Sequence, residues 1–357
     1  MDIHLHDPLS LLLIFLLALL AAVLVLFALL LLQRIAGTLW AQHARRREAA
    51  LTSLLLAALT NPSDVQPLVR AVKRSDRLII RDMILRLALD LKGDEGETLA
   101  GVYRDLGLLR HDLTELREGH WMKRAATVAR LGALRSLEVL PSLCAALSDP
   151  VVAVRLAAVR AVGETGDHEG LIALVSLLGD SNPGVARATV EVLTLRGREV
   201  AEDVLAFLKT ATTSSARRAA VDVLGFVRAP QAADALFALV EDPDPTLRIK
   251  VVKAVAAIGD PRSKNLLENL LEDPLWEVRC FAAKGLSLLA SSDSVPRLRR
   301  ALEDSHWWVR FYAGLALAEL GAVGRNALQE EMAEGRPLAR TIARYLLDRF
   351  EATPVIP

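Results

Sequence analysis

Cysteine is scarce in this sequence, with Cys144 and Cys280 the only two among 357 residues. Neither belongs to a Cys-x-x-Cys pair or has a histidine beside it, so a reactive thiol is not favoured. We interpret both as small hydrophobic residues, buried in a protein of a reducing compartment.

The sequence also lacks an excess of charge, because 43 basic side chains balance 43 acidic ones. A chain without net charge has no global field that would attract nucleic acid. It contains no Gly-rich phosphate loop, no His-Glu-x-x-His and no Gly-x-Ser-x-Gly. We therefore expect no catalytic, cofactor-binding or metal-binding residues, no cofactor, no small-molecule substrate and no nucleic-acid partner.

Polar residues are missing from one long segment: between Leu9 and Leu32 the only polar side chain is Ser10. As a helix rising ~1.5 Å per residue it is roughly 36 Å long, which spans a hydrocarbon core of about 30 Å. A cleaved signal peptide would have a basic leader and a shorter apolar stretch, whereas the leader MDIHLHD is acidic. We predict an uncleaved transmembrane helix.

The charges on either side of this segment predict its orientation. Asp2 and Asp7 precede it. The arginines that follow it are Arg34, Arg45, Arg46 and Arg47. Because positive charge accumulates on the cytoplasmic side, we expect a single span in the inner membrane of a bacterium, with the N-terminus outside and the rest of the chain in the cytoplasm.

Arginine recurs with a fixed period along the rest of the chain. The members stand thirty-one residues apart, or twice that: Arg124, Arg155, Arg217, Arg248, Arg279 and Arg310. Six residues before each of these positions, counting the missing member at Ala186, there is usually an aspartate: Asp149, Asp180, Asp242, Asp273 and Asp304. One apolar row keeps the same period without exception: Leu131, Val162, Leu193, Leu224, Val255, Leu286 and Leu317. A second does so too: Leu143, Leu174, Leu205, Leu236, Leu267 and Leu298. Such periodicity predicts one elongated array.

Each period reads as a pair of helices. In DPVVAVRLAAVRAVGETGD, Asp149 is predicted to cap the first helix and Pro150 to lie in its first turn. Apolar residues then recur at helical spacing along one stripe. The helix is predicted to end at Gly163, Gly166 and Asp167, and a leucine-rich second helix follows. Neither helix buries its stripe alone, so neighbouring units must stack.

The spacing Asp-Pro-x-x-x-Val-Arg-x-x-Ala with a later Gly-Asp turn, seen from Asp149 to Asp167 and in similar form from Asp242 to Asp260, resembles HEAT repeats. The alanine-rich form of thirty-one residues is similar to HEAT-like repeats of the phycobilisome lyase type. This resemblance implies an all-α fold, a right-handed α-solenoid of helical hairpins. The predicted division is 1–8 short extracytoplasmic leader, 9–32 transmembrane helix, 33–117 juxtamembrane and divergent helical pairs, 118–335 seven repeats, 336–350 capping helix and 351–357 disordered tail.

Two repeats depart from the pattern. The third has Ala186 in place of the arginine, with Arg187 beside it, and the fourth has Ala211 in place of the aspartate. We expect the superhelix to bend or loosen there.

We interpret the Asp and Arg rows as a structural ladder. Each arginine is expected to lay its stem along the apolar seam and to bind an aspartate between repeats through two parallel hydrogen bonds. The clearest members are Asp149, Arg155, Asp242, Arg248, Asp273, Arg279, Asp304 and Arg310.

Aromatic residues make up 4% of the chain, yet several gather near its C-terminal end. Those that keep the period, such as Trp121, are suited to cover the join between stacked repeats. The alternative is a docking surface, because aromatic clusters concentrate binding energy at interfaces. The candidate partner-binding residues are Trp276, Trp307, Trp308, Phe311 and Tyr312.

The second helices carry acidic residues in the earlier repeats, whereas Arg297, Arg299 and Arg300 cluster in the sixth. In HEAT-like arrays these helices line the concave face, so the resemblance implies an acidic groove ending in a basic patch. A solvated face is the other interpretation.

Together these features predict a membrane-tethered scaffold or adaptor without catalysis, which binds a protein such as an integral membrane enzyme or an envelope assembly. One alternative is an enzyme or enzyme subunit resembling the phycobilin lyases, for which a membrane span has no obvious use. Another is nucleic-acid binding, as in HEAT-like proteins that resemble alkylated-base glycosylases, which the balanced charge disfavours.

Overall fold

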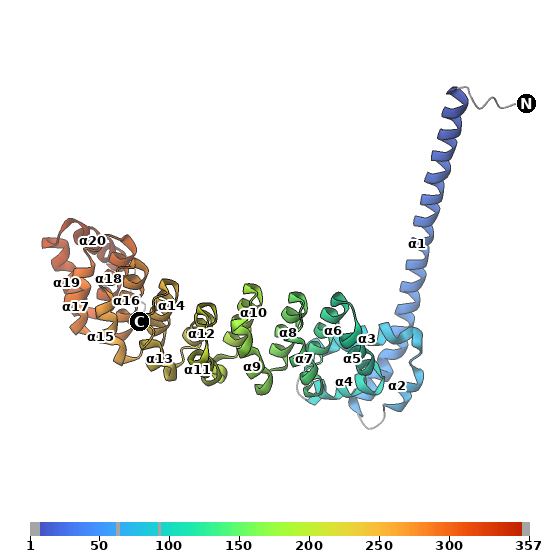
Figure 1. The fold of residues 1–357 in the computed structure, drawn as a ribbon, viewed down its shortest axis with the longest axis horizontal. Helices are drawn as coiled ribbons and strands as arrows, with labels where there is room; N and C mark the ends of the chain where they lie inside the picture. Colours follow the sequence, from blue (N-terminus) through green and yellow to red (C-terminus); the bar gives the residue numbers. More distant parts are fainter. Residues whose placement is uncertain (1–7, 62–64, 92–93, 352–357) are drawn as a thin grey trace, which may run out of the picture. The chain divides into compact units, whose positions relative to one another are not determined.

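The computed structural model describes residues 8–61, 65–91 and 94–351 (Figure 1). Every regular element in these ranges is a helix, so the all-α prediction is confirmed. The chain forms two compact units. Unit 1 is the chain up to Thr114 together with Ala133–Arg135, and unit 2 is Glu115–Gly132 together with the chain from Ser136 onward. The predicted leader and tail fall largely outside the described residues.

Unit 1 is dominated by the helix α1, which spans Pro8–Thr60. Its apolar stretch, Phe15–Gly37, has a mean hydropathy of 3.3 and no buried residue. The helix does not end at Leu32 as the predicted span did, because strong helix formers such as Ala, Leu and Arg dominate until Pro62. Its last turns bury Leu51 and Leu55 among the other helices of unit 1.

The remaining helices of unit 1 are short. They are α2 Gln66–Ala71, α3 Arg77–Asp90, α4 Asp94–Asp105 and α5 Leu108–Glu118, the last of which reaches into unit 2. Arg47, one of the cations predicted to flank the span, instead binds inside this unit. Its Nη2 donates to Asp76 Oδ2 at 2.5 Å and to the carbonyl of Ala71 at 3.1 Å. Arg47 therefore fixes α1 against the segment that precedes α3.

Unit 2 alternates first helices with second helices, which are the shorter ones except at α19, and Figure 1 shows the successive hairpins from green to red. The first helices are α6 Trp121–Ala133, α8 Val152–Thr165, α10 Pro183–Leu195, α12 Ser214–Phe226, α14 Pro245–Ile258, α16 Trp276–Leu289 and α18 Trp307–Glu319. The second helices are α7 Leu140–Ala146, α9 His168–Val175, α11 Ala201–Thr210, α13 Ala233–Phe237, α15 Lys264–Leu270, α17 Val295–Ala301 and α19 Gly321–Glu334. The closing helix α20 is Pro337–Glu351.

Short 3-10 helices directly precede most of these second helices, and one follows α9. They are η1 Arg74–Asp76 in unit 1 and η2 Leu137–Val139, η3 Ser176–Gly179, η4 Gly197–Val200, η5 Pro230–Ala232, η6 Pro261–Ser263 and η7 Ser292–Ser294 in unit 2. Stacked first helices contact each other along the array. The structure is thus a solenoid of helical hairpins, as the period implied.

The apolar rows form the core of unit 2. Every member of the first row is fully buried or nearly so: Leu131, Val162, Leu193, Leu224, Val255, Leu286 and Leu317. The second row is buried as well, except at Leu205, which is half-buried. The two rows therefore line the seam between successive hairpins, where neither helix could shield them alone.

Two details of the predicted repeat are wrong. The helix α8 begins at Val152, so Asp149 and Pro150 lie in the turn before it. Asp149 Oδ1 accepts a hydrogen bond from the amide of Val151 at 2.8 Å, which shapes this turn. Gly163 does not end the helix but lies inside it. Glycine is required at this position because a Cβ would stand 2.4 Å from Val192 Cγ1 of α10. Gly166, at φ 70°, is the residue that ends α8.

Candidate functional site

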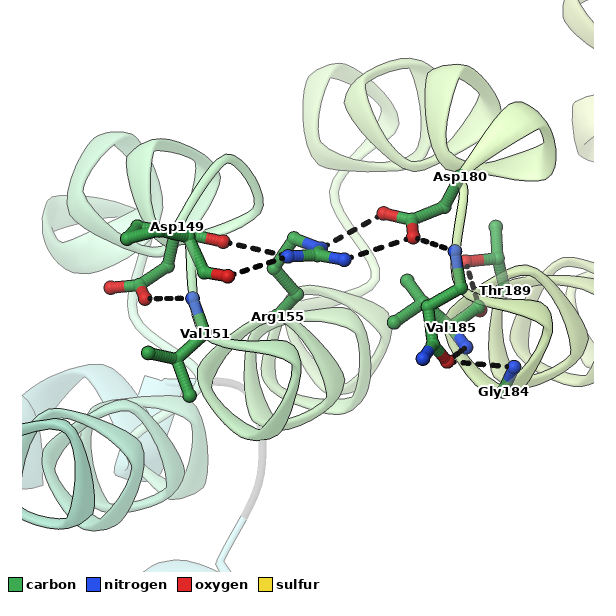
Figure 2. A network of polar contacts seen from close by, with 9 residues as sticks. Asp149, Val151, Arg155, Asp180, Gly184, Val185 and Thr189 are labelled. Atoms are coloured by element: carbon green, nitrogen blue, oxygen red, sulfur yellow. Dashed lines mark hydrogen bonds and ion pairs between the residues drawn. The ribbon is translucent and has the colours of Figure 1, made fainter.

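Arg155 of α8 joins two successive repeats, as Figure 2 shows. Its Nε and Nη2 donate to the two carboxylate oxygens of Asp180 at 2.9 and 3.0 Å. Its Nη1 donates to the backbone carbonyl of Asp149 at 2.9 Å. One guanidinium therefore fastens the turn of its own repeat to the carboxylate of the next, in the bidentate geometry that is strongest for this pair.

The same contact recurs along unit 2, always with the aspartate that follows twenty-five residues later. Arg124 and Arg279 make two bonds each, to Asp149 and Asp304, at 2.6 to 2.9 Å. Two further pairs are weaker. Arg217 makes one bond of 2.6 Å to Asp242, and Arg248 Nη2 lies 4.0 Å from Asp273.

The two departures predicted in the third and fourth repeats are the two halves of one missing pair. Ala186 stands where the arginine would be, and Ala211, twenty-five residues later, stands where its aspartate would be. Arg187 does not replace the arginine, because its Nε lies 3.2 Å from Glu191 of its own helix and both side chains are exposed. The join between α10 and α12 therefore lacks the contact present at the neighbouring joins.

Folding lowers the pKa of two ladder carboxylates, those of Asp149 and Asp304. Burial acts to raise the pKa of Asp304, but the hydrogen bonds from Arg279 and from the amide of His306 outweigh it and lower that pKa. Burial is outweighed at Asp149 in the same way, by Arg124 and the amide of Val151. Both carboxylates are therefore held ionised by folding.

We expect acid to destabilise unit 2 through these groups. A carboxylate whose pKa is lowered by folding stabilises the folded form fully above its unfolded pKa of about 3.9. That contribution is lost as the pH falls through the lower folded-state pKa, so the free energy of unfolding should fall below about pH 4. Circular dichroism during acid titration checks this. The variant Asp304→Asn should lose less stability below that pH than the wild type does, and equal losses would contradict the assignment.

The aromatic residues of α18 form one exposed surface. Trp307 stacks on Phe311 with ring centroids 5.1 Å apart, and Trp308 stacks on Tyr312 at 6.2 Å. Tyr345 of α20 adds a fifth ring, 6.4 Å from Phe311. The side chains of Trp307, Trp308 and Tyr345 are 44%, 46% and 45% exposed. We call these five residues the α18 aromatic surface. It holds four of the five predicted partner-binding residues, whereas sequence reasoning missed Tyr345.

Trp276, the remaining predicted partner-binding residue, lies elsewhere. Its ring stacks on that of His306, with centroids 3.7 Å apart and planes 12° from parallel. Trp276 belongs to α16, and His306 precedes α18 in the next repeat. This tryptophan therefore covers the join between repeats, which was the structural interpretation of the periodic rings.

The basic patch predicted on the second helices is absent from the described structure, because neighbouring carboxylates neutralise its arginines. The pairs are Arg297 with Glu268 at 3.5 Å, Arg299 with Glu330 and with Glu331 at 2.7 Å, and Arg300 with Glu272 at 3.7 Å. This surface carries alternating charge rather than a field of one sign.

A cavity of about 220 Å³ lies between α12 and α14 and was not anticipated. Phe226 is exposed on its wall, with Lys253 Nζ 5.7 Å from the ring centroid. Lys250 also lines the cavity and pairs with Asp222. Gly225 and Ala254 also line it, and the two helices approach closely there, since a Cβ on Gly225 would stand 2.8 Å from Ala254 Cβ.

The described residues contain no group of three or more His, Cys, Asp or Glu side chains that could hold a metal ion. Both cysteines are free. Burial raises the pKa of Cys280 to about 11, so its thiol is protonated at neutral pH. Burial also raises the pKa of Cys144.

Comparison with known proteins bears on the fold. The sequence profile of HEAT repeats matches residues 112–194, 201–275 and 264–347. No curated protein matches the chain. Among solved structures, an engineered protein is 15% identical, with a TM-score of 0.43 over 85% of this chain and 99% of that chain.

Two natural proteins show a similar degree of likeness. The complex of CpcE and CpcF of phycocyanin lyase from Nostoc sp. PCC7120 is 18% identical, with a TM-score of 0.31 over 67% of this chain and 92% of that chain. A structure of Kap95p with RanGDP is 11% identical, with a TM-score of 0.48 over 78% of this chain and 45% of that chain. The profile match covers more than half of the sequence, in the same stretch that forms the stacked hairpins. The chain belongs to the HEAT repeat family.

Proposed function

We propose that this protein is a membrane-tethered scaffold whose solenoid binds a protein partner through the α18 aromatic surface. The observation that carries the proposal is the exposure of Trp307 and Trp308 on α18. Trp276, the periodic counterpart of Trp307, is instead stacked on a ring of the next repeat. Large exposed aromatic side chains contribute heavily to binding energy at protein interfaces. A rigid stack of helices holds them in place before the partner arrives, which lowers the entropy cost of binding.

The tether rests on α1. Each residue of Phe15–Gly37 is exposed, and this stretch of 23 residues is long enough to cross a bilayer. Left in water it would expose a large apolar surface. Inserted as a span with the acidic leader outside, it holds the solenoid at the cytoplasmic face of the inner membrane, where an integral membrane enzyme or an envelope assembly is within reach. Confinement to one membrane raises the effective concentration of such a partner.

We expect the full-length chain to remain in the membrane pellet after alkaline extraction of cells. A variant with Leu24→Arg and Val25→Arg should be released, because two arginines in the middle of the span cost about 5 to 7 kcal/mol. A matched variant with Leu24→Phe and Val25→Leu should stay in the pellet. Release of the wild type by alkali would contradict the proposal that α1 anchors the protein in the membrane.

The binding half is tested by affinity purification from gently solubilised membranes. A partner held by the wild type should be lost from Trp307→Ala and Trp308→Ala, since truncating a central tryptophan costs about 2 kcal/mol or more, over tenfold in affinity. Trp121→Ala is the control, because Trp121 is also exposed but lies on α6. Equal loss from all three variants would rule out the α18 aromatic surface as the binding site.

A further inference from the structure

Two side chains of α16 hold the turn that opens the next repeat. Arg279 takes the carboxylate of Asp304 through two hydrogen bonds of 2.6 and 2.8 Å. Trp276 stacks on the ring of His306, which stands two residues after that aspartate. The pair Trp-x-x-Arg on a first helix therefore recognises a carboxylate followed, two residues later, by a flat ring.

The helix α18 carries the same pair, with Trp307 and Arg310 in the sequence WWVR where α16 has WEVR. Nη1 of Arg310 donates to the carbonyls of Asp304 and Ser305 at 2.6 and 3.0 Å. Nη1 of Arg279 donates at 2.9 Å to the carbonyl of Asp273, the same position one repeat earlier. The guanidinium of Arg310 is therefore fixed to its own turn in the way that prepares Arg279 to bind a carboxylate.

The turn that follows α19 lacks the carboxylate and the flat ring that this pair would bind. Gly335 follows Arg310 by twenty-five residues, where a ladder aspartate would stand, and Pro337 takes the position of His306. In the described part of the chain, the hydrogen bonds of Arg310 go only to backbone carbonyls. Trp307 is exposed where Trp276 is covered by a ring. We call Trp307 and Arg310 the open clamp.

We propose that the open clamp binds an acidic segment of the protein partner, one that presents a carboxylate and, two residues later, a flat ring. Arg310 binds the carboxylate with two parallel hydrogen bonds, and one face of Trp307 stacks on the ring of the partner. Phe311 packs against Trp307, with ring centroids 5.1 Å apart. The charge of Arg310 has no ionic partner in the described structure, so it complements an acidic segment. This inference rests on the proposed function and gives its partner a chemistry.

The test uses the full-length chain in lipid nanodiscs and a fluorescein-labelled peptide with the sequence ALEDSH, which is residues 301–306 of this chain and presents Asp304 and His306. Fluorescence anisotropy should show saturable binding with a Kd on the order of 0.1 to 1 mM, since one ion pair and one stacked ring supply the affinity. The matched peptide with Asp304→Asn should bind at least about tenfold more weakly. Equal binding of the two peptides would overturn the inference.

Variants of the chain assign the site. Arg310→Gln should weaken binding of ALEDSH by about tenfold and Trp307→Ala by about threefold, whereas Arg187→Gln, a change at an exposed arginine of α10, should leave it unchanged. Hydrogen exchange of the α18 amides reports whether Arg310→Gln remains folded. If it does not, Trp307→Ala carries the test, because Trp307 lies at the surface and is not among the buried core residues. Undiminished binding by Trp307→Ala would overturn the inference.

The inference and the proposed function fail differently. If affinity purification yields a partner that is lost from Trp308→Ala but retained by Arg310→Gln, the open clamp is wrong and the scaffold stands. If ALEDSH binds as expected but no protein binding depends on Trp307 or Trp308, Trp307 and Arg310 do recognise a carboxylate and a ring, but the proposed scaffold function and the clamp's role in it are wrong.

Discussion

Replacing Arg279 with alanine is expected to destabilise unit 2 by about 2 to 5 kcal/mol. The side chain of Asp304, 11% exposed beside Arg279, loses both hydrogen bonds from the guanidinium, while the amide of His306 still donates to it. Removing one partner of a mostly buried ion pair costs more than the pair contributes, because the remaining charge stays desolvated. It also frees the carbonyl of Asp273 that Arg279 holds.

The loss should be local, since each repeat contacts only its neighbours. Hydrogen exchange of the amides of α16 and α18 in the detergent-solubilised chain measures it directly, together with the melting temperature. Arg187→Ala is the matched control, because Arg187 pairs with Glu191 on one exposed helix face, an arrangement worth only about 0.3 to 0.5 kcal/mol. If the two variants unfold alike, the ladder does not hold the repeats together.

Replacing Leu236 with alanine in the otherwise unchanged chain is expected to lower the free energy of unfolding by about 2 to 5 kcal/mol, the range for truncating a fully buried leucine. Leu236 is fully buried in α13, and the rigid helices on either side can close the resulting cavity only in part. Leu205 is the control within the same periodic row, because it is the half-buried member on α11. Leu205→Ala should cost distinctly less. Thermal and denaturant unfolding of the two variants, followed by circular dichroism, compares them, and equal costs would show that the row is not the core.

The fold could be predicted from sequence because the period repeats the same evidence many times. A single apolar stripe such as that of α8 is ambiguous, but the row from Leu131 to Leu317 aligns across every repeat and, together with the row from Leu143 to Leu298, fixes the helix pairs. The boundaries were less predictable. Asp149 was placed at the helix cap, whereas its carboxylate is turned toward Arg124 and the helix begins later. Glycine inside a helix was interpreted as its end, although Gly163 is there to admit α10.

The candidate site was only partly visible in the sequence. The period showed that aspartate and arginine recur, but it did not determine that Arg155 reaches forward to Asp180, because this depends on how far one hairpin is displaced from the next. Trp276 and Trp307 differ because the segment after Trp276 provides the ring of His306, whereas Pro337 stands at the corresponding position after Trp307. Tyr345 joins the surface from the closing helix α20, after the last predicted repeat, so no periodic row indicated it.

The paired absence at Ala186 and Ala211 has a mechanical consequence. Among the described joins from α6 to α18, the one between α10 and α12 lacks an Arg–Asp pair, so a stack of helices pulled at both ends should yield there first. Tension along unit 2 would separate the array there first, leaving stiff blocks on both sides intact. A load applied along the stacked helices from α6 to α18 would thus lengthen the stack at one defined join.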